Sequence, residues 1–446
     1  MEPQLIGYIG FAAVLMLLAL RIPIAISLGG VATAGMVLVY AWQPWMPFSL
    51  QAAWAPVASL LGSTPIGFIN SYALSTVPLF IFVGHLAFQA GFTSDIYSAA
   101  RVWLARIPGG LAIASIVGCG GFSAISGSSV ACAAAMGRVA VPEMLESRYS
   151  KSLASGSVAI GGTLGSLIPP SILFIIFGVF AEQSITKLFL AAMVPGLLSL
   201  LGYVLVVIVW VRVRPQDAPQ PDIEVARAQR AGTLARCWPI VTLFVVIIGG
   251  IYVGAFTPTE AAGVGAVATL ALGVLLRRLS LSKIAEALRE AVTQSAQLFA
   301  IAIAGKLFVN FIALTNVSSD LTEWLGSAGL SVVLVMALIT LLYVVLGMML
   351  DPLGIILLTL PLTLPVVESY GLDLIWFGVI VVKLLEIGLV TPPIGLNVFV
   401  IKSIVGEKIP LEKIFFGVGM FLISDVVVML LLLSFPVLSL YLPSLL

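Results

Sequence analysis

The sequence predicts an all-α polytopic membrane protein with two inverted repeats, each containing a re-entrant helical hairpin and a broken Pro-Pro helix. Three observations favour this fold class. The 446 residues are 61% hydrophobic and 9% charged, whereas soluble domains carry about 25% charged residues. Apolar stretches of membrane-spanning length recur along the chain. Two Pro-Pro pairs interrupt such stretches at corresponding places in the two halves.

Most of the apolar stretches fit membrane spans, which need about 20 residues each. Two more stretches, 110–137 and 330–362, fit either a crossing or a hairpin that returns to the same face. The first span has neither a basic region before it nor a small-residue cleavage site, so we expect it to be retained rather than removed as a signal peptide. The candidate spans are 4–20, 22–41, 76–91, 153–180, 187–211, 239–256, 260–276, 291–313, 374–402 and 414–435.

The distribution of Lys and Arg resolves the two ambiguous stretches. Residues 42–75, 250–259 and 316–373 contain neither residue type, and positive charge marks the cytoplasmic side of a membrane protein. The basic clusters share one side only if 110–137 and 330–362 are hairpins that enter from opposite faces. These clusters are Arg21; Arg101 and Arg106; Arg138, Arg148 and Lys151; 212–236; 277–289; and Lys402, Lys408 and Lys413.

The two halves of the chain share a motif. The sequences GSLIPP, ending at Pro170, and GLVTPP, ending at Pro393, have the same spacing and lie 223 residues apart, each downstream of a predicted hairpin. Because the flanks of the two hairpins differ in charge, the halves have inverted orientations, which is typical of secondary transporters. The predicted organisation is a first repeat at 1–213, a cytoplasmic connection at 214–238 and a second repeat at 239–446.

The Pro-Pro pairs predict unwound backbone inside the membrane. Proline lacks an N–H group and clashes with the preceding helical turn, so the helices must break near Ile168–Pro170 and Thr391–Pro393. Irregular backbone at membrane depth is stable only where it is buried in protein or lines a polar site. Freed carbonyl groups suit a small cation, and the N-termini of half-helices suit an anion.

The predicted hairpin tips supply side chains for such sites. The first tip, Gly120–Ser129, is rich in glycine and serine, and serine hydroxyls both donate and accept hydrogen bonds. The second tip, 347–354, has fewer hydroxyls but carries Asp351, which is either a binding group or the N-cap of a helix that starts at Pro352. Close packing of helices through small residues is the simpler alternative for both tips.

Several other ionisable side chains lie within apolar stretches, where such groups are functional candidates. Lys383 and Glu386 are three residues apart, so we expect them to pair on one helix face. His85 and Lys306 occupy similar positions in the two repeats, and each is either functional or a capping or interface-seeking side chain. Glu260 stands near a span start and fits a capping role.

Other function classes find little support. The three cysteines lack metal-binding spacing and His85 is the sole histidine. No run of basic residues could follow a nucleic acid, and no GxxxxGK[ST] motif supports ATP hydrolysis. An intramembrane hydrolase built on Ser128 or Asp351 would lack a histidine base and a second, paired aspartate.

Three motifs, GGFSAISGSSVACAAAMG, GGTLGSLIPPSILFIIFG and EIGLVTPPIGLNVFVIKSI, together resemble the large membrane subunit of tripartite ATP-independent periplasmic (TRAP) transporters over essentially the whole chain. The resemblance implies an elevator-type ion-transporter fold in the bacterial inner membrane, and a transporter rather than an enzyme. It implies Na⁺-coupled uptake of an organic anion, a C4-dicarboxylate or a sugar acid, without any cofactor beyond the coupling ion. The expected partners are a periplasmic substrate-binding protein and a small four-span membrane subunit. We expect that subunit to be a separate chain, because no such segment precedes the large-subunit pattern.

The resemblance also implies where ions and substrate bind. One sodium site would combine the hydroxyls of Ser126 and Ser129 with carbonyls near Gly165, Ile168 and Pro169. The other would combine carbonyls near Gly347, Gly388 and Ile394 with Thr391. The substrate would lie between the tips, near Ser128, Ser171 and Asn397, with Asp351 as a further candidate. Lys383 stands where an uncharged polar residue is expected in relatives. Its role is therefore open.

Two further expectations concern mechanism. A transport half would move across a scaffold that includes the lateral segments 42–75 and 277–290. The main alternative function is a stand-alone sodium–dicarboxylate carrier of the same fold, which would need no binding protein.

Overall fold

The computed structural model describes residues 2–42, 47–219 and 236–445, and these residues form helices and connections with no strand. Eight of the described helices are long and apolar enough to cross a membrane, or up to nine if a bent pair counts as one span. The all-α membrane class predicted from the sequence is therefore confirmed. The eight are Ile24–Ala41, Leu50–Ile69, Tyr72–Gln89, Ile185–Val213, Pro258–Leu275, Leu281–Thr315, Pro352–Ser369 and Leu411–Ser434.

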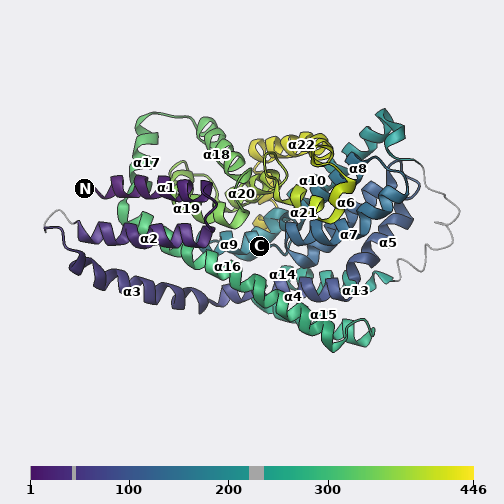
Figure 1. The fold of residues 1–446 in the computed structure, drawn as a ribbon, viewed down its shortest axis with the longest axis horizontal. Helices are drawn as coiled ribbons and strands as arrows, with labels where there is room; N and C mark the ends of the chain where they lie inside the picture. The colour runs from purple at the N-terminus through teal and green to yellow at the C-terminus, as the bar shows by residue number, and fades with distance from the viewer. Residues whose placement is uncertain (1, 43–46, 220–235, 446) are drawn as a thin grey trace.

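One end of the elongated molecule is formed by three N-terminal helices that lie side by side (Figure 1). These are α1 (Pro3–Ala19), α2 (Ile24–Ala41) and α3 (Leu50–Ile69). The long helix α16 (Leu281–Thr315) packs against α2 and α3 and continues to the other end, where it contacts α4 (Thr76–Gln89). Helix α15 (Pro258–Leu275) covers α4.

The segment 277–290, expected to lie laterally in the scaffold, belongs mostly to a longer helix. Residues 281–290 form the first turns of α16, which runs without a break for 35 residues, or about 52 Å at 1.5 Å per residue. Residues 281–290 include Leu, Ala and Glu twice each and have neither Pro nor Gly, so nothing in them ends a helix.

The first half contains a helical hairpin followed by a broken helix. Helices α6 (Gly110–Ser126) and α7 (Ser129–Glu146) form the hairpin, and both pack against α8 (Lys151–Leu167). A four-residue break and a bend of 40° separate α8 from α9 (Ile172–Phe180). Helix α5 (Phe92–Leu104) precedes the hairpin, and α10 (Ile185–Val213) follows the broken helix.

In the second half, another pair of helices precedes the second Pro-Pro pair. Helices α18 (Val332–Gly347) and α19 (Pro352–Ser369) form the second pair, after α17 (Val317–Ser327). Helix α20 (Leu374–Gly388) ends before the second Pro-Pro pair, and α21 (Leu396–Val405) continues after it. Helix α22 (Leu411–Ser434) then packs against α8, α10 and α20. Both Pro-Pro bonds are cis.

Between the halves, α13 (Trp238–Phe244), the π-helical η3 (Val245–Gly249) and α14 (Gly250–Tyr252) form one apolar stretch. Most of the predicted connection at 214–238 lies outside the described residues, apart from the turn Pro215–Asp217 and its flanks.

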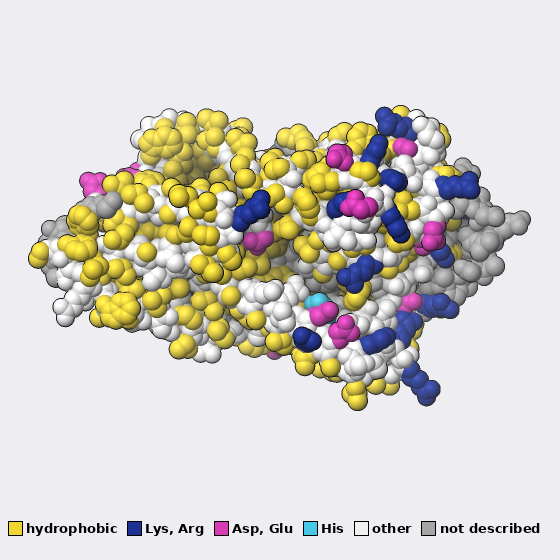
Figure 2. Space-filling view, in the orientation of Figure 1, with side chains coloured by type: hydrophobic (Ala, Val, Ile, Leu, Met, Phe, Trp, Pro, Cys, Tyr) yellow, Lys and Arg dark blue, Asp and Glu magenta, His cyan; other side chains and the backbone are white. Residues whose placement is uncertain are grey.

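Charged side chains gather at one end of the molecule. Figure 2 shows Lys and Arg concentrated over the part that holds α5, α7, α13 and α15, whereas the part that holds α1–α3 is mostly hydrophobic. Ion pairs occur within the charged end, where Arg101 meets Glu143 and Arg278 meets Asp95. The positive-inside rule predicts that this end faces the cytoplasm.

Candidate functional site

The tip of the first hairpin packs directly against the first helix break. Gly127 links α6 to α7 with a φ of 62°, and its carbonyl accepts a hydrogen bond from the N–H of Ile172 at 3.2 Å. A methyl group on Gly127 would lie 2.7 Å from the carbonyl oxygen of Pro170, and one on Gly165 would lie 2.6 Å from that of Ser128. Only glycine allows so close an approach of two backbones.

The second hairpin meets the second broken helix in the same way. A methyl group on Gly388, at the end of α20, would lie 2.5 Å from the Cα atom of Gly347, at the end of α18. The side chain of Asp351 accepts a hydrogen bond from the N–H of Gly354 at 3.3 Å. Asp351 therefore acts as the N-cap of α19, the structural alternative that the sequence offered for it.

Side chains from both halves meet at the first tip. The hydroxyl of Ser129 donates to Oε2 of Glu386 at 2.6 Å and lies 2.8 Å from the hydroxyl of Ser166. Glu386 is 1% exposed. Its Oε1 atom and the hydroxyl of Ser126 have no hydrogen-bond partner among the described residues. One buried polar cluster thus joins the first tip, the end of α8 and helix α20 of the second half.

The expected pairing of Lys383 with Glu386 is wrong. The ammonium group of Lys383 lies 2.5 Å from Oδ1 of Asp425 on α22, and it also donates to Ser199 at 3.0 Å and Tyr203 at 3.4 Å. Lys383 turns toward α10 and α22, while Glu386 turns toward α7 and α8. Asp425 is 1% exposed and is the buried partner of Lys383. Because Asp425 lies on another helix, the spacing of residues along α20 does not predict this pair.

The two breaks differ in their surroundings. Pro169, Pro170 and Ser171 are buried, and Ile168 is partly buried, whereas Pro392, Pro393 and Ile394 are exposed. Thr391 is partly buried, and its hydroxyl donates to the carbonyl of Ile387 at 2.6 Å. The first predicted ion site is therefore enclosed, and the second is open on one side.

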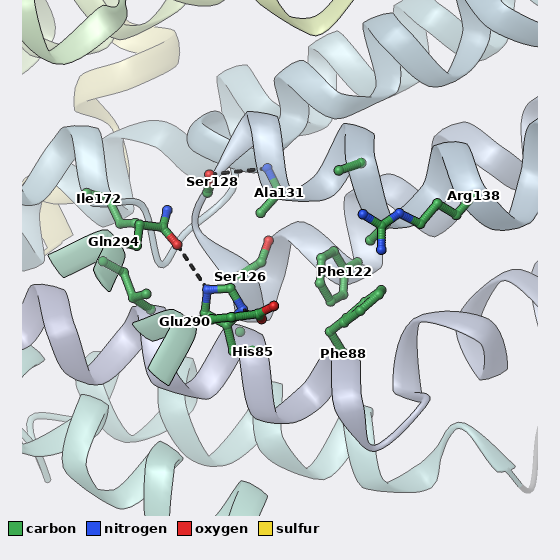
Figure 3. A pocket seen from close by; sticks show the side chains of 14 residues that line it. His85, Phe88, Phe122, Ser126, Ser128, Ala131, Arg138, Ile172, Glu290 and Gln294 are labelled. Carbon is green, nitrogen blue, oxygen red and sulfur yellow. Dashed lines mark hydrogen bonds and ion pairs between the residues drawn. The ribbon is translucent and has the colours of Figure 1, made fainter. Parts of the chain in front are cut away.

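A cavity of about 170 Å³ lies between the first tip and helices α4 and α16. His85 occupies its wall: Nδ1 lies 2.8 Å from Oε2 of Glu290, and Nε2 lies 3.0 Å from Oε1 of Gln294. Figure 3 shows Ser126 and Ser128 beside these groups, and Arg138 at the opposite end of the cavity. A larger hollow of about 720 Å³ adjoins it along α16.

The cavity brings together only part of the predicted substrate site. Ser128 lines it and accepts a hydrogen bond from the N–H of Ala131 as the N-cap of α7. Ser171 is fully buried and caps α9, and Asn397 is fully buried and donates to the carbonyl of Ala159 at 3.4 Å. These two residues and Asp351 do not line this cavity.

Sequence reasoning missed the cavity wall on α16. Glu290 and Gln294 are four residues apart, and with Glu286 and Gln297 they form a polar stripe on a long helix. That stripe is a detectable signal, because residues spaced by three or four share a helix face. The sequence singles out His85 but not its partners. Lys306, the counterpart of His85, lies 6.0 Å from the ring centroid of Phe180.

The proposed capping role of Glu260 is confirmed. Its carboxylate accepts from the N–H of Thr257 at 2.8 Å, and the Thr257 hydroxyl accepts from the N–H of Glu260 at 3.3 Å. This reciprocal capping box stabilises the start of α15.

Comparison with known proteins identifies relatives of the chain. Residues 11–438 match the family described as tripartite ATP-independent periplasmic transporter, DctM component. The C4-dicarboxylate TRAP transporter large permease protein DctM of Pseudomonas aeruginosa is 34% identical over 374 residues, covering 84% of this chain and 86% of the relative. The sialic acid TRAP transporter large permease protein SiaM of Vibrio cholerae is 32% identical, covering 85% and 88%.

Solved structures with a similar fold are also transporters. The YdaH transporter of Alcanivorax borkumensis matches with a TM-score of 0.53 and 15% identity, over 100% of this chain and 98% of the other. MtrF of Neisseria gonorrhoeae matches with a TM-score of 0.58 and 14% identity, over 97% and 95%. At such identities the likeness shows the fold alone.

Family and spans agree on the class of protein. The described helices supply the spans of a multi-pass inner-membrane protein, and the relatives are transporter permease subunits rather than enzymes. The chain belongs to the DctM component family of tripartite ATP-independent periplasmic transporters.

Proposed function

We propose that this protein is the transport subunit of a sodium-coupled uptake system for an organic anion, which a periplasmic binding protein delivers. The observation that carries the proposal is the seating of each hairpin tip on a broken helix, through Gly165 and Gly127 in the first half and Gly347 and Gly388 in the second. Such contacts bring carbonyls, hydroxyls and helix ends to one place inside a membrane protein. This is the arrangement that ion-coupled carriers use.

Two sodium ions would bind at these contacts. The first site would use the hydroxyls of Ser126 and Ser129 with carbonyls of Gly165, Ile168 and Pro169. The buried hydroxyl of Ser126, which has no hydrogen-bond partner among the described residues, supports it. The second would use carbonyls of Gly347, Gly388 and Ile394 with Thr391, and the contact between the two glycines supports it. Each ion would order a tip against its break.

The anion would bind in the cavity beside the first tip. Ser128 stands there at the N-terminus of α7, where the helix dipole favours negative charge. Arg138 supplies a cation at the other end. Relatives are named for C4-dicarboxylate, sialic acid and ectoine, so an organic acid is the expected class of substrate. Ser171, Asn397 and Asp351 would act by holding the broken helices and the second tip in place.

Transport would follow an elevator motion. The hairpins and broken helices, with their inverted repeats, would form the moving part. Helices α2, α3, α4, α15 and α16, which pack on one another, would form the scaffold. The cavity lies where α4 and α16 face the first tip, which is the boundary that such a motion must cross.

A small membrane subunit and a binding protein would complete the system. The isethionate TRAP transporter permease protein DctMQ of Oleidesulfovibrio alaskensis is 32% identical to this chain, and the match covers 91% of this chain but only 61% of that relative. A fused permease of that kind supports the expectation that a small subunit works beside the large one.

Reconstitution tests the proposal. Proteoliposomes that hold this chain with its small subunit should take up an acid from the loaded binding protein when Na⁺ is high outside. They should stop when the Na⁺ gradient is removed. Uptake that ignores the Na⁺ gradient would contradict the coupling. Equal uptake without the binding protein would favour a stand-alone carrier.

A further inference from the structure

The polar core around α20 contains two carboxyl groups and one ammonium group. Lys383, Glu386 and Asp425 are each 1% exposed. The Lys383 ammonium group lies 2.5 Å from Asp425 and donates its other hydrogen bonds to Ser199 and Tyr203. Lys383 and Asp425 therefore neutralise each other. No Lys, Arg or His in the described part of the chain pairs with Glu386.

An isolated carboxylate in such surroundings is costly. Burying a charge without a partner is strongly unfavourable, and membrane interiors retain such groups for function. One oxygen of Glu386 is satisfied by Ser129 at 2.6 Å, but Oε1 has no partner in the described structure. A buried oxygen of this kind is itself a mark of a ligand position.

Glu386 lies where elements from the two halves of the chain meet. Ser129 begins α7 just after the first tip, and Ser166 lies two residues before Ile168 at the end of α8. Glu386 lies on α20, two residues before Gly388, which contacts the second hairpin. A ligand here touches both halves of the molecule.

We propose that Glu386 is the anionic ligand of a monovalent cation at the first tip, with the hydroxyls of Ser129 and Ser166 beside it. Carboxylate and hydroxyl oxygens are hard ligands, which suit Na⁺, and one unbalanced charge calls for one positive charge. This inference rests on the proposed first sodium site and adds its counter-charge, which comes from the opposite half of the chain.

The substitution Glu386→Gln tests the proposal. It preserves size and the acceptor for Ser129 but removes the charge. The half-saturating Na⁺ concentration for uptake should rise at least about tenfold, the effect of one charge-assisted contact. Na⁺-dependent thermal stabilisation of the purified protein should shrink in parallel, and this readout needs no transport. Glu412→Gln makes the same chemical change at an exposed position on α22 and should alter neither quantity.

Measurements at several pH values distinguish Na⁺ from a proton as the ligand. The charged and titratable groups that surround Glu386 are Lys383 on its own helix, Asp425 on α22 and Tyr203 on α10. Because Na⁺ is the proposed ligand, Glu386→Gln should weaken Na⁺ binding at every pH. An unchanged Na⁺ half-saturation in Glu386→Gln, or a change confined to the pH profile of uptake, would overturn the proposal.

A second set of variants tests the charge balance without touching Glu386. Asp425→Asn leaves the Lys383 ammonium group one helical turn from Glu386, where it can replace the cation, so Na⁺ half-saturation should rise. The double change Lys383→Met and Asp425→Leu removes both charges and should leave the half-saturating Na⁺ concentration within about twofold of the parent value. An unchanged value in Asp425→Asn together with a raised value in the double variant would contradict the inference. If uptake by the parent protein itself shows no Na⁺ dependence, the proposed function fails, whatever the variants show.

Discussion

Gly165→Ala is the sharpest test of the contact between the first tip and its break. The added methyl group would lie 2.6 Å from the carbonyl oxygen and 2.7 Å from the carbonyl carbon of Ser128, and 2.8 Å from the Cα atom of Ser129. All three are backbone atoms, so no flexible side chain can move aside. A carbon and a carbonyl oxygen normally approach to about 3.3 Å, so the tip must retreat by roughly 0.7 Å.

This retreat has a predictable cost. Overpacking of this kind costs about 1–3 kcal/mol. Because Na⁺ binding is proposed to require the closed contact, that energy appears as a rise of about 5- to 150-fold in the half-saturating Na⁺ concentration. Uptake by proteoliposomes over a Na⁺ titration measures it.

A matched control separates sterics from the simple change of residue. Gly263 lies in α15, and a methyl group added there would have nothing within 4 Å, so Gly263→Ala should leave Na⁺ half-saturation unchanged. If Gly165→Ala folds normally and keeps the parent half-saturation, the first tip does not close on the break when Na⁺ binds, and the reasoning fails.

Three other predictions concern the second tip, the cavity and the buried ion pair. Gly388→Ala should also raise Na⁺ half-saturation by about 5- to 150-fold, because its methyl group would lie 2.5 Å from the Cα atom of Gly347. His85→Ala should raise the KM for the anion about tenfold and leave Na⁺ half-saturation near the parent value. The reason is that His85 lines the cavity and contacts Glu290 and Gln294 in its wall. A change confined to Na⁺ dependence would contradict this prediction. Lys383→Met should destabilise the protein by about 3–5 kcal/mol, since it leaves the buried carboxylate of Asp425 without its cation, and thermal unfolding in detergent measures the loss.

Local patterns were enough to predict the two helix breaks and their contacts with the hairpin tips, although the spanning helix Leu50–Ile69 was missed. Proline pairs and glycine spacing at the end of α8 and the end of α20 located both breaks, and the tips pack on those breaks through Gly165 and Gly388. Glu260 capped its helix as expected, because a capping box lies within four consecutive residues. Such features depend on neighbours in the sequence.

Long-range pairing was beyond the same reasoning. Lys383 has two buried carboxylates within reach of its helix face, and the nearer one in sequence, Glu386, is not its partner. The choice depends on how α22 packs against α10 and α20, which no local spacing reveals. The wall of the cavity shows the same limit, because His85 and Glu290 are separated by 205 positions and meet only through the packing of α4 on α16.

The two tips also differ in a way that affects coupling. The first tip is enclosed and touches Glu386, while the second rests on Gly388 beside an exposed break. Both contacts fall within three residues at the end of one helix, α20. A cation held by Glu386 would fix this helix end, and so would favour the seating of the second tip before any ion binds there. Na⁺ binding at the two tips should therefore be cooperative, with the enclosed site first, and Glu386→Gln should lower the Hill coefficient for Na⁺ as well as the affinity. A Hill coefficient for Na⁺ that is unchanged in Glu386→Gln would show that the tips communicate by another route.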